Sequence, residues 1–222
     1  MKKRALAFVM PAMFIGLTSL TADAQPAANQ PRGGPAPAAA NVVYDAAAVP
    51  AGTYVVDHLH SALTGSVRHS GLSHFVFRFK RFDAKFTYDP AKPDAPSIEV
   101  TIDPASFDTN VQGFDTDLVT SDRYFNVAKF PAITFVSNSL KRTGPDKGVM
   151  SGTITFLGVS KPLDFDVTFL GVAKARNGAS VGFSATTTIY RSDFGMATGS
   201  GDLDDIVSVA VEADFMQQRP PQ

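Results

Sequence analysis

The sequence contains no cysteine and no tryptophan, and it has 5 tyrosines against 18 phenylalanines. Without cysteine there is no disulfide framework, no thiolate nucleophile and no attachment point for a lipid on sulfur. The folded part must therefore be held together by its apolar core. A chain of 222 residues is long enough to bury such a core in one β-domain or two small domains.

An excess of basic residues is also missing. The formal net charge is −1, and it becomes −3 when residues 1–24 are removed, because that segment carries Lys2, Lys3, Arg4 and Asp23. A mildly acidic domain without a basic run is a poor partner for nucleic acid. After the N-terminal segment, no stretch approaches the roughly 18 continuous apolar residues of a membrane-spanning helix, so we expect a soluble mature protein without stable membrane insertion.

The N-terminus has the three parts of a secretory signal peptide. Lys2-Lys3-Arg4 is followed by an apolar run over residues 5–20 and by an A-x-A cleavage site at Ala22-Asp23-Ala24. A membrane anchor is the alternative, but the run is short and contains Pro11. The pattern predicts a signal peptide over residues 1–24 and a periplasmic or secreted protein.

The rest of the chain divides by composition. Residues 25–49 are rich in alanine and proline and poor in large apolar side chains, which predicts a flexible linker. Residues 218–222 form a proline-containing tail that we expect to be disordered. The folded domain is therefore predicted to span residues 50–217.

The most informative pattern is a pair of phenylalanine stripes. Phe75, Phe77 and Phe79 alternate with other residues at the period of a β-strand, so their side chains share one face of a sheet. Phe82 and Phe86 continue the alternation in the opposite phase. The phase break at Lys80-Arg81 predicts a bulge or a sharp bend. Such a face can fill a core or line a cavity.

Further segments with strand patterns follow one another along the chain, and residues 142–147 form a polar turn that predicts a hairpin. The strand segments are 53–56, 61–69, 98–102, 132–140, 149–157, 163–169, 180–190 and 206–215. Residues 107–129 lack the alternation and have the pattern of one or two short helices. About nine β segments with a single helical insertion predict an all-β antiparallel barrel or sandwich.

Two patterns could carry catalytic chemistry. The four histidines, His58, His60, His69 and His74, lie close together in the sequence, and an H-x-H pair can chelate zinc or copper. Ordinary hydrogen bonding at turns and strand ends is the alternative. Residues 178–182 match the nucleophile motif G-x-S-x-G, but an extended run follows where that motif requires a helix, which favours a chance match.

Five segments together resemble the YceI-like family of exported bacterial proteins, in order and in approximate spacing. They are Asp57 to Ser61, His69-Ser70-Gly71, Asp122 to Pro131, Gly158 to Pro162 and Arg191 to Met196. The resemblance covers about residues 52–216. It implies an extended lipocalin-like antiparallel barrel of about eight strands, enclosing a long apolar pocket for polyisoprenoid, quinone-like or fatty-amide molecules.

The chain departs from the family pattern at two places. Phe77 stands where the family usually carries a glycine, and Ser70 stands where an apolar residue is common. A phenylalanine in place of glycine is expected to narrow the pocket. The length of the bound molecule is therefore open.

The predicted ligand contacts are apolar residues of the strand segments, most of them phenylalanines, together with a few polar residues. The apolar ones are Phe75, Phe77, Phe79, Phe82, Phe86, Ile133, Phe135 and Phe156, and the polar ones are His69, Arg191 and Asp193. An apolar tail needs a dry lining and one or two polar groups at the mouth. An ion pair between Arg191 and Asp193 that fixes the strand end is the alternative for those two residues.

The favoured function is that of a carrier that holds a long apolar amphiphile. We expect no enzymatic activity and no cofactor. Two alternatives stay open. One is a metal-dependent enzyme or metal-binding protein that uses the histidines at positions 58, 60, 69 and 74. The other is an interaction domain whose barrel is filled by its own phenylalanines. A homodimer is a further possibility that the sequence does not decide.

Overall fold

The computed structural model of the chain describes residues 41–93, 97–176, 178–196 and 202–219. The predicted signal peptide, residues 25–40 of the predicted linker and residues 220–222 of the predicted tail lie outside the described residues. The described residues belong to one compact unit, Ala39–Gln222.

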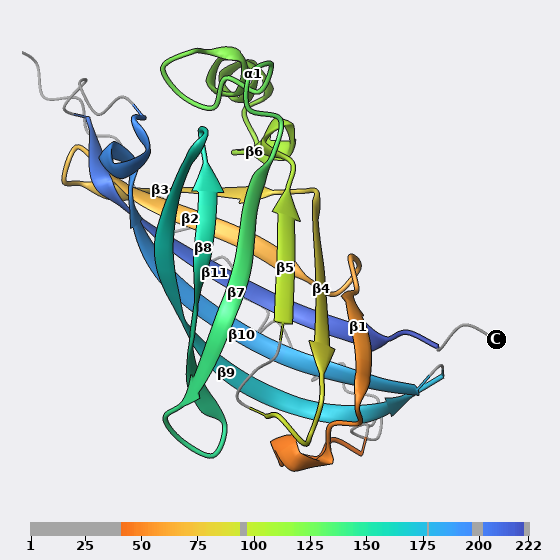
Figure 1. Ribbon diagram of the computed structural model, residues 1–222. Coiled ribbons are helices and arrows are strands. Elements are labelled where there is room, and N and C mark those ends of the chain that lie inside the picture. Colours follow the sequence, from red (N-terminus) through yellow and green to blue (C-terminus); the bar gives the residue numbers. More distant parts are fainter. Residues whose placement is uncertain (1–40, 94–96, 177, 197–201, 220–222) are drawn as a thin grey trace, which may run out of the picture. The chain divides into compact units, whose positions relative to one another are not determined.

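Eight antiparallel strands close into a barrel, because β1 at one end of the strand order also pairs with β11 (Figure 1). In spatial order the ring is β1 (Gly52–Val56), β4 (Phe82–Tyr88), β5 (Ser97–Ile102), β7 (Ile133–Arg142), β8 (Lys147–Phe156), β9 (Val159–Ala175), β10 (Gly178–Tyr190) and β11 (Leu203–Gln217). Closure gives every strand of the ring two neighbours and leaves no free sheet edge among them. The predicted antiparallel barrel is confirmed, and the sandwich does not form.

Three further strands extend the barrel at one end. The first two thirds of β11 pair with β2 (Ala62–His69), which pairs with β3 (Ser73–Phe79), which in turn pairs with the short β6 (Phe107–Asp108). Asp108 of β6 accepts hydrogen bonds from Arg78 Nε at 2.7 Å and Lys80 Nζ at 3.3 Å, which lower the pKa of its carboxyl group. The sequence pattern missed β6, since two residues carry no periodicity.

The phase break between the two phenylalanine stripes is a sharp bend and not a bulge. The chain leaves β3 at Phe79 and enters β4 at Phe82, and the two strands pair with different partners. Ser106 holds the bend: its backbone oxygen accepts from Lys80 N at 3.1 Å, and its Oγ accepts from Arg81 N at 2.9 Å and donates to Asp103 O at 2.7 Å. The bend keeps both stripes on the inside of the barrel.

Replacing Ser106 by alanine is expected to lower the free energy of unfolding by about 1–3 kcal/mol, because it leaves the Arg81 amide without its acceptor in a buried place. Urea unfolding measures the change. Ser139→Ala is the matched control, since the Ser139 hydroxyl contacts the exposed Asn138 side chain. Equal stabilities of the two variants would show that the serine does not hold the bend.

The predicted hairpin of residues 132–157 is confirmed as β7 and β8, with Arg142 paired to Gly148 beside the turn. The three strands β9, β10 and β11 are longer than their sequence patterns indicated. They pair with one another over most of their length and form one continuous wall of the barrel (Figure 1). The G-x-S-x-G match lies inside this wall, at the extended start of β10, where Ser180 pairs with Ala173 and Met216.

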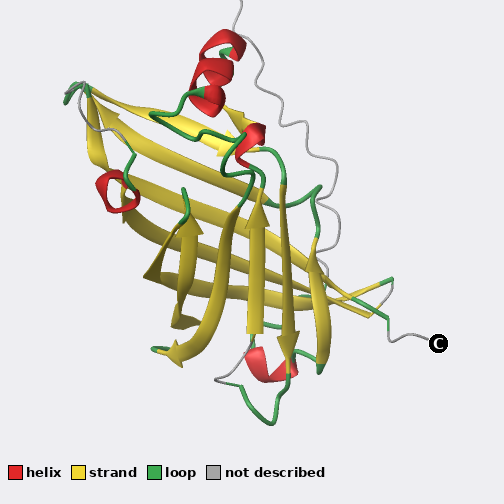
Figure 2. Cartoon of the chain, turned by 45° about the horizontal axis from the view of Figure 1, so that its top comes forward, coloured by secondary structure: helices red, strands yellow, loops and turns green. Residues whose placement is uncertain are grey.

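Within the part of the chain that the structure describes, the helical insertion contains one α-helix, α1 (Gln112–Thr120), preceded by the 3-10 helix η2 (Pro104–Ser106). Helix α1 lies at the end of the barrel formed by β3 and β6 (Figures 1 and 2). The buried Asp115 ties the helix to the residue that follows β6, because its carboxylate accepts from the Thr109 amide at 3.0 Å and hydroxyl at 2.5 Å. Leu118 turns inward from the helix and is buried.

Two aromatic clusters lie at the two ends of the barrel. Near α1, the Phe107 ring lies with its centroid 4.9 Å from those of both Phe77 and Phe125, and the ring contacts continue through Phe156 to Phe194. At the other end the cluster contains Tyr54, Phe86, Phe169, Phe183 and Phe215. Partly buried side chains such as Ile98, Val100 and Ile102 pack against both clusters. The space between the clusters is the candidate site.

Candidate functional site

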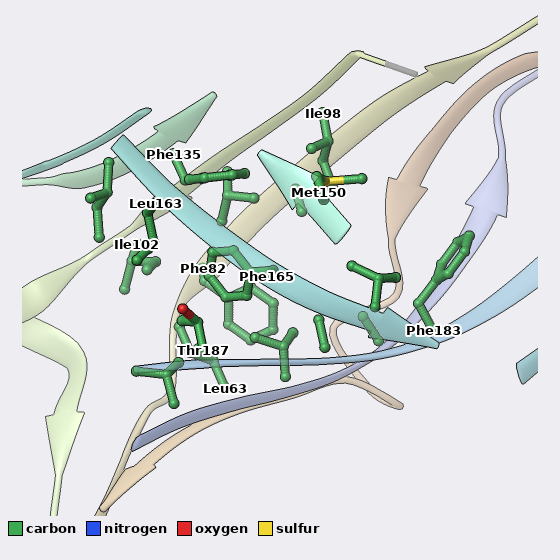
Figure 3. A pocket seen from close by; sticks show the side chains of 18 of the residues that line it. Leu63, Phe82, Ile98, Ile102, Phe135, Met150, Leu163, Phe165, Phe183 and Thr187 are labelled. Atoms are coloured by element: carbon green, nitrogen blue, oxygen red, sulfur yellow. The ribbon is translucent and has the colours of Figure 1, made fainter. Parts of the chain in front are cut away.

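The barrel encloses a cavity of about 330 Å³ (Figure 3). The residues that line it include Leu63, Phe82, Ile98, Ile102, Phe135, Met150, Leu163, Phe165, Phe183 and Thr187. Ligand cavities of β-barrels are of this size or larger. On β11 the lining runs from Leu203 to Phe215, which at about 3.3 Å per residue is roughly 40 Å along the strand. The cavity is therefore long and follows the wall of the barrel.

The lining is apolar because every strand of the wall turns its apolar residues inward. Successive side chains of a strand point to opposite faces, so an alternating sequence lines one face with one kind of side chain. The longest inward rows on β9, β10 and β11 are Leu163, Phe165, Val167 and Phe169; Phe183, Ala185, Thr187 and Ile189; and Val207, Val209, Val211, Ala213 and Phe215. Such a surface offers contact to an apolar chain along its whole length.

Charged side chains line the cavity at its two ends. Arg142, Asp146 and Lys147 come from the β7–β8 turn, at the start of β8. Arg191 lies near the other end of the same strand, since its 3-10 helix η3 (Arg191–Phe194) places Phe194 at 5.4 Å from Phe156. The nine residue steps from Lys147 to Phe156 span about 30 Å. Polar groups are thus available at both ends of an apolar cavity.

Arg191 is the one charged residue of the lining that is buried, with 6% of its surface exposed. Its guanidinium donates to the Asp204 carbonyl at 3.0 Å. The neighbouring Asp205 carboxylate accepts from the Ser192 hydroxyl at 2.5 Å and the Ser192 amide at 2.7 Å. These hydrogen bonds, with the charge of Arg191, lower the pKa of Asp205. A cationic group is therefore fixed beside the cavity.

The end of the barrel opposite α1 is covered by the segment before β1 (Figure 1). Val43 exchanges two backbone hydrogen bonds with Val172 of β9, at 2.8 and 2.9 Å. After the 3-10 helix η1 (Ala46–Ala48), the buried Val49 reaches the cavity, which Ala46 also lines. The described end of the predicted linker, residues 41–49, thus packs on the barrel.

The structure brings most of the predicted site residues together. Nine of them line the cavity: Phe75, Phe77, Phe79, Phe82, Phe86, Ile133, Phe135, Phe156 and Arg191. His69 and Asp193 lie outside the lining. His69 is exposed at the end of β2, and Asp193 is exposed and pairs with Lys161 Nζ at 2.9 Å. Contact of any of these residues with a ligand stays a prediction.

The sequence patterns missed a second group of lining residues, which includes Leu63, Val67, Met150, Leu163 and Val207. Parity from the phenylalanine stripes could have found those on β9, since Leu163 and Phe165 alternate with aspartates. Strand β2 gave a weak signal because its inward row is Leu63, Gly65 and Val67, in which glycine interrupts the apolar pattern.

The histidines do not form one cluster. His58 and His60 lie in the turn between β1 and β2, whereas His69 and His74 lie at the far ends of β2 and β3. The seven residue steps of β2 separate the two pairs by about 23 Å along the strand. Among the residues that the structure describes, no group of three or more histidine, aspartate or glutamate side chains could hold a metal ion.

The first two histidines each have an aspartate partner. His58 Nε2 lies 3.2 Å from Asp83, and His60 Nδ1 lies 2.7 Å from Asp57. The hydrogen bond to Asp57 raises the pKa of His60, and the same bond, with the Leu59 amide, lowers the pKa of Asp57. All four groups face solvent or the turn and do not line the cavity.

Within the described ranges, no helix is long and apolar enough to cross a membrane.

A closed antiparallel barrel around an apolar cavity defines a protein of lipocalin-like architecture. The chain belongs to the YceI-like family: the model of the YceI-like domain matches residues 54–215. That range contains all eleven strands except the first two residues of β1 and the last two of β11. The resemblance inferred from five short segments is confirmed.

Known relatives agree with this assignment. The chain is 32% identical over 183 residues to Protein YceI of Escherichia coli, covering 81% of this chain and 95% of that protein. The crystal structure of Burkholderia cenocepacia BcnA superposes with a TM-score of 0.63 at 29% identity, covering 72% and 98% of the two chains. A polyisoprenoid binding domain from Saccharophagus degradans shares the fold, with a TM-score of 0.59 at 14% identity over 74% and 98% of the chains.

Proposed function

We propose that the protein is an exported carrier that binds a long-chain apolar amphiphile inside its barrel, of the polyisoprenoid, quinone-like or fatty-amide class. The observation that carries this proposal is the apolar cavity, walled by inward residues of β2 to β5 and β7 to β11 and extending along the length of the barrel. The Saccharophagus domain with the same fold is described as polyisoprenoid binding. Binding, rather than catalysis, is what this lining supports.

The energetics favour a chain-like ligand. Apolar surface removed from water contributes about 25 cal/mol per Å², so each 55 Å² of buried tail corresponds to roughly tenfold in affinity. A slender tail makes contact on all sides in a narrow barrel. A compact polar metabolite would leave its hydrogen-bonding groups unpaired against phenylalanine and valine, which costs free energy.

The polar ends of the cavity suit the polar group of an amphiphile. Arg191 offers a buried cation near α1, and the β7–β8 turn offers Arg142 and Lys147 beside Asp146 at the other end. We assign the head group to the Arg191 end, because a buried guanidinium gives stronger charge-assisted hydrogen bonds than a solvated one. Carbonyl and phosphate oxygens are the acceptors that it would bind.

The predicted signal peptide over residues 1–24 supports export, and a periplasmic or secreted location is part of the proposal. A carrier in that location would shield an apolar tail from water between two membranes. A homodimer stays a prediction from the sequence.

The ligand can be identified by expressing the full chain in a Gram-negative host, purifying it from the periplasm without detergent, and extracting it with organic solvent for mass spectrometry. One apolar amphiphile in a near-equimolar amount is expected, above an extract of an unrelated exported protein prepared alongside. A lipid-free extract, combined with a melting temperature unmoved by polyprenol and by ubiquinone, would refute the proposal.

A further inference from the structure

Gly65 interrupts an inward apolar row of the barrel wall. On β2, Leu63 and Val67 line the cavity and Gly65 lies between them on the same buried face of the strand. On β3 the lining residues are Phe75, Phe77 and Phe79. The register pairs each residue of one row with one of the other, so that Gly65 lies directly opposite Phe77. Phe77 is thus the one phenylalanine of its stripe that faces a residue without a side chain.

The ring of Phe77 occupies the space that a side chain at position 65 would need. A Cβ built on Gly65 would lie 2.3 Å from Phe77 Cζ and 2.6 Å from Cε2, closer than two carbon atoms can approach. Gly65 does not have the positive φ that favours glycine, so an L-residue is allowed by the backbone there. Glycine is needed at this position for space.

The ring therefore lies against the wall over Gly65 and does not cross the cavity. Its other contacts are with Phe107 at 4.9 Å and Phe79 at 6.0 Å, both in the aromatic cluster near α1. Displacement away from Gly65 would move the ring toward those two side chains and the cavity. The position of one ring thus depends on the absence of one Cβ.

The same arrangement recurs on another part of the wall. A Cβ built on Gly152 of β8 would lie 2.4 Å from Phe135 Cζ, so the Phe135 ring also lies over a glycine. Both rings line the cavity. At Gly152 the Val136 carbonyl oxygen is also close, at 2.5 Å, so a side chain there would displace the backbone. Gly65 is the position at which the effect of the ring can be isolated.

We propose that the Gly65–Phe77 pair determines which apolar chains the cavity accepts, by keeping the Phe77 ring on the wall and the α1 end of the cavity open to a long tail. The proposal rests on the proposed function, since it names a selection among ligands of the same site. It assigns chain-length selectivity to a glycine, through the space that its missing side chain leaves for the Phe77 ring.

The test compares Gly65→Ala with Gly182→Ala, a matched control in the same barrel. A Cβ built on Gly182 would lie 3.4 Å from Asp214 Oδ1 and from Leu170 Cβ, which is an ordinary van der Waals contact. The backbone of Gly182 does not have a positive φ. Phe77→Ala and the double variant Gly65→Ala/Phe77→Ala complete a cycle in which the ring is absent. Each protein is titrated with farnesol, geranylgeraniol and solanesol by thermal shift, and crystal structures of the wild type and Gly65→Ala locate the ring.

In Gly65→Ala, the affinity for the longest alcohol that the wild type binds is expected to fall at least tenfold relative to the affinity for farnesol. The ring is expected to stand away from the wall in the crystal. Gly182→Ala should keep the wild-type ratio. In the double variant the ratio should return to that of Phe77→Ala, because no ring remains to be displaced, whereas a general loss of packing would persist.

A wild-type ratio in folded Gly65→Ala would overturn the proposal, and so would an equal loss in the double variant. If Gly65→Ala does not fold, Phe77→Ala decides alone: because the ring already lies on the wall, its removal should leave the wild-type ratio unchanged, and a tenfold gain for the longer alcohols relative to farnesol would show that the ring obstructs the cavity in the wild type and would refute the proposal. A wild type that binds none of the three alcohols refutes the proposed function and the selectivity with it. The crystals distinguish the cases, since a ring unmoved by the new Cβ contradicts the inference whatever binds.

Discussion

Ala185→Trp is expected to abolish binding of a long-chain alcohol while the barrel stays folded. Ala185 lies in the inward row of β10 and lines the cavity, between the inward-facing Val167 and Val211 on the neighbouring strands. A tryptophan side chain covers 150–250 Å², several times the roughly 55 Å² of contact that corresponds to a tenfold change in affinity. The affinity for geranylgeraniol should therefore fall by well over tenfold.

The matched control is Thr186→Trp, one residue further along the same strand. Thr186 is exposed on the outer face, because successive residues of a strand point to opposite sides. The chain has no tryptophan of its own, so each variant carries a single tryptophan, which can be excited selectively over the tyrosines. Emission should be blue-shifted for position 185 and typical of a solvent-exposed indole for position 186. Wild-type affinity in Ala185→Trp, with a blue-shifted indole, would show that the ligand binds elsewhere.

Tyr54→Ala is expected to cause the largest loss of stability. Tyr54 is completely buried, its ring stacks on Phe86 with centroids 4.6 Å apart, and its hydroxyl donates to the Pro50 carbonyl at 2.8 Å. Truncation of a buried aromatic side chain lowers the free energy of unfolding by about 3–5 kcal/mol. That is a large part of the roughly 5–15 kcal/mol of a typical domain, and a barrel without disulfides has no cross-link to compensate.

Urea unfolding at neutral pH measures the loss. Tyr190→Ala is the control, since Tyr190 is 49% exposed on the outer face of β10 and surface substitutions usually change stability by no more than about 0.5 kcal/mol. A loss below about 1 kcal/mol for Tyr54→Ala would show that the aromatic cluster at this end of the barrel does not hold the fold.

The same residue gives the barrel an alkaline limit. Burial, with a contribution from Tyr88, raises the pKa of Tyr54 to about 12, against about 10 for an exposed tyrosine. The folded state thus retains a proton that the unfolded chain loses. The stability that this provides is present below about pH 10 and is lost as the pH rises from about 10 to 12. Tyr54→Phe should lack this decrease, relative to the wild type measured alongside.

Much of the barrel follows from period-two alternation. Each of the two phenylalanine stripes was predicted to share one face of a sheet, with a break at Lys80-Arg81 and without a decision on which of them face a cavity. Both stripes line the interior, on either side of a bend. The break could not be assigned from the sequence, because the group that holds it is Ser106, far away in the chain. Alternation is local, and the contacts that turn the strand are not.

The site could be predicted in its apolar part and less well in its polar part. Phenylalanine parity marked the lining, since the wall of a small barrel has one interior face. It could not show that Gly65 matters to the cavity, because the role of this glycine is to leave room for a ring on the next strand. Of the predicted polar pair Arg191 and Asp193, only Arg191 lines the cavity. Both residues lie in a 3-10 helix, in which neighbouring residues face different sides. Arg191 therefore turns inward, while Asp193 pairs with Lys161.

The histidines show how proximity in sequence misleads in a sheet. His60 and His69 are separated by a whole strand, so they lie at opposite ends of β2 although nine positions apart in the chain. A metal site built from the four histidines was an open alternative from the sequence, and the structure places the histidines in two separate pairs at opposite ends of β2. Residues from different strands at one level of the barrel are the ones that meet.

Native mass spectrometry of the full chain, purified from the periplasm without detergent, tests the central claim most directly. For the wild type and Thr186→Trp, the expected spectrum shows the barrel with one apolar molecule bound, released at higher collision energy. For Ala185→Trp, it shows the barrel alone. Ligand-free spectra for all three proteins, even after incubation with geranylgeraniol or ubiquinone, would contradict the claim, and so would the same bound molecule in Ala185→Trp.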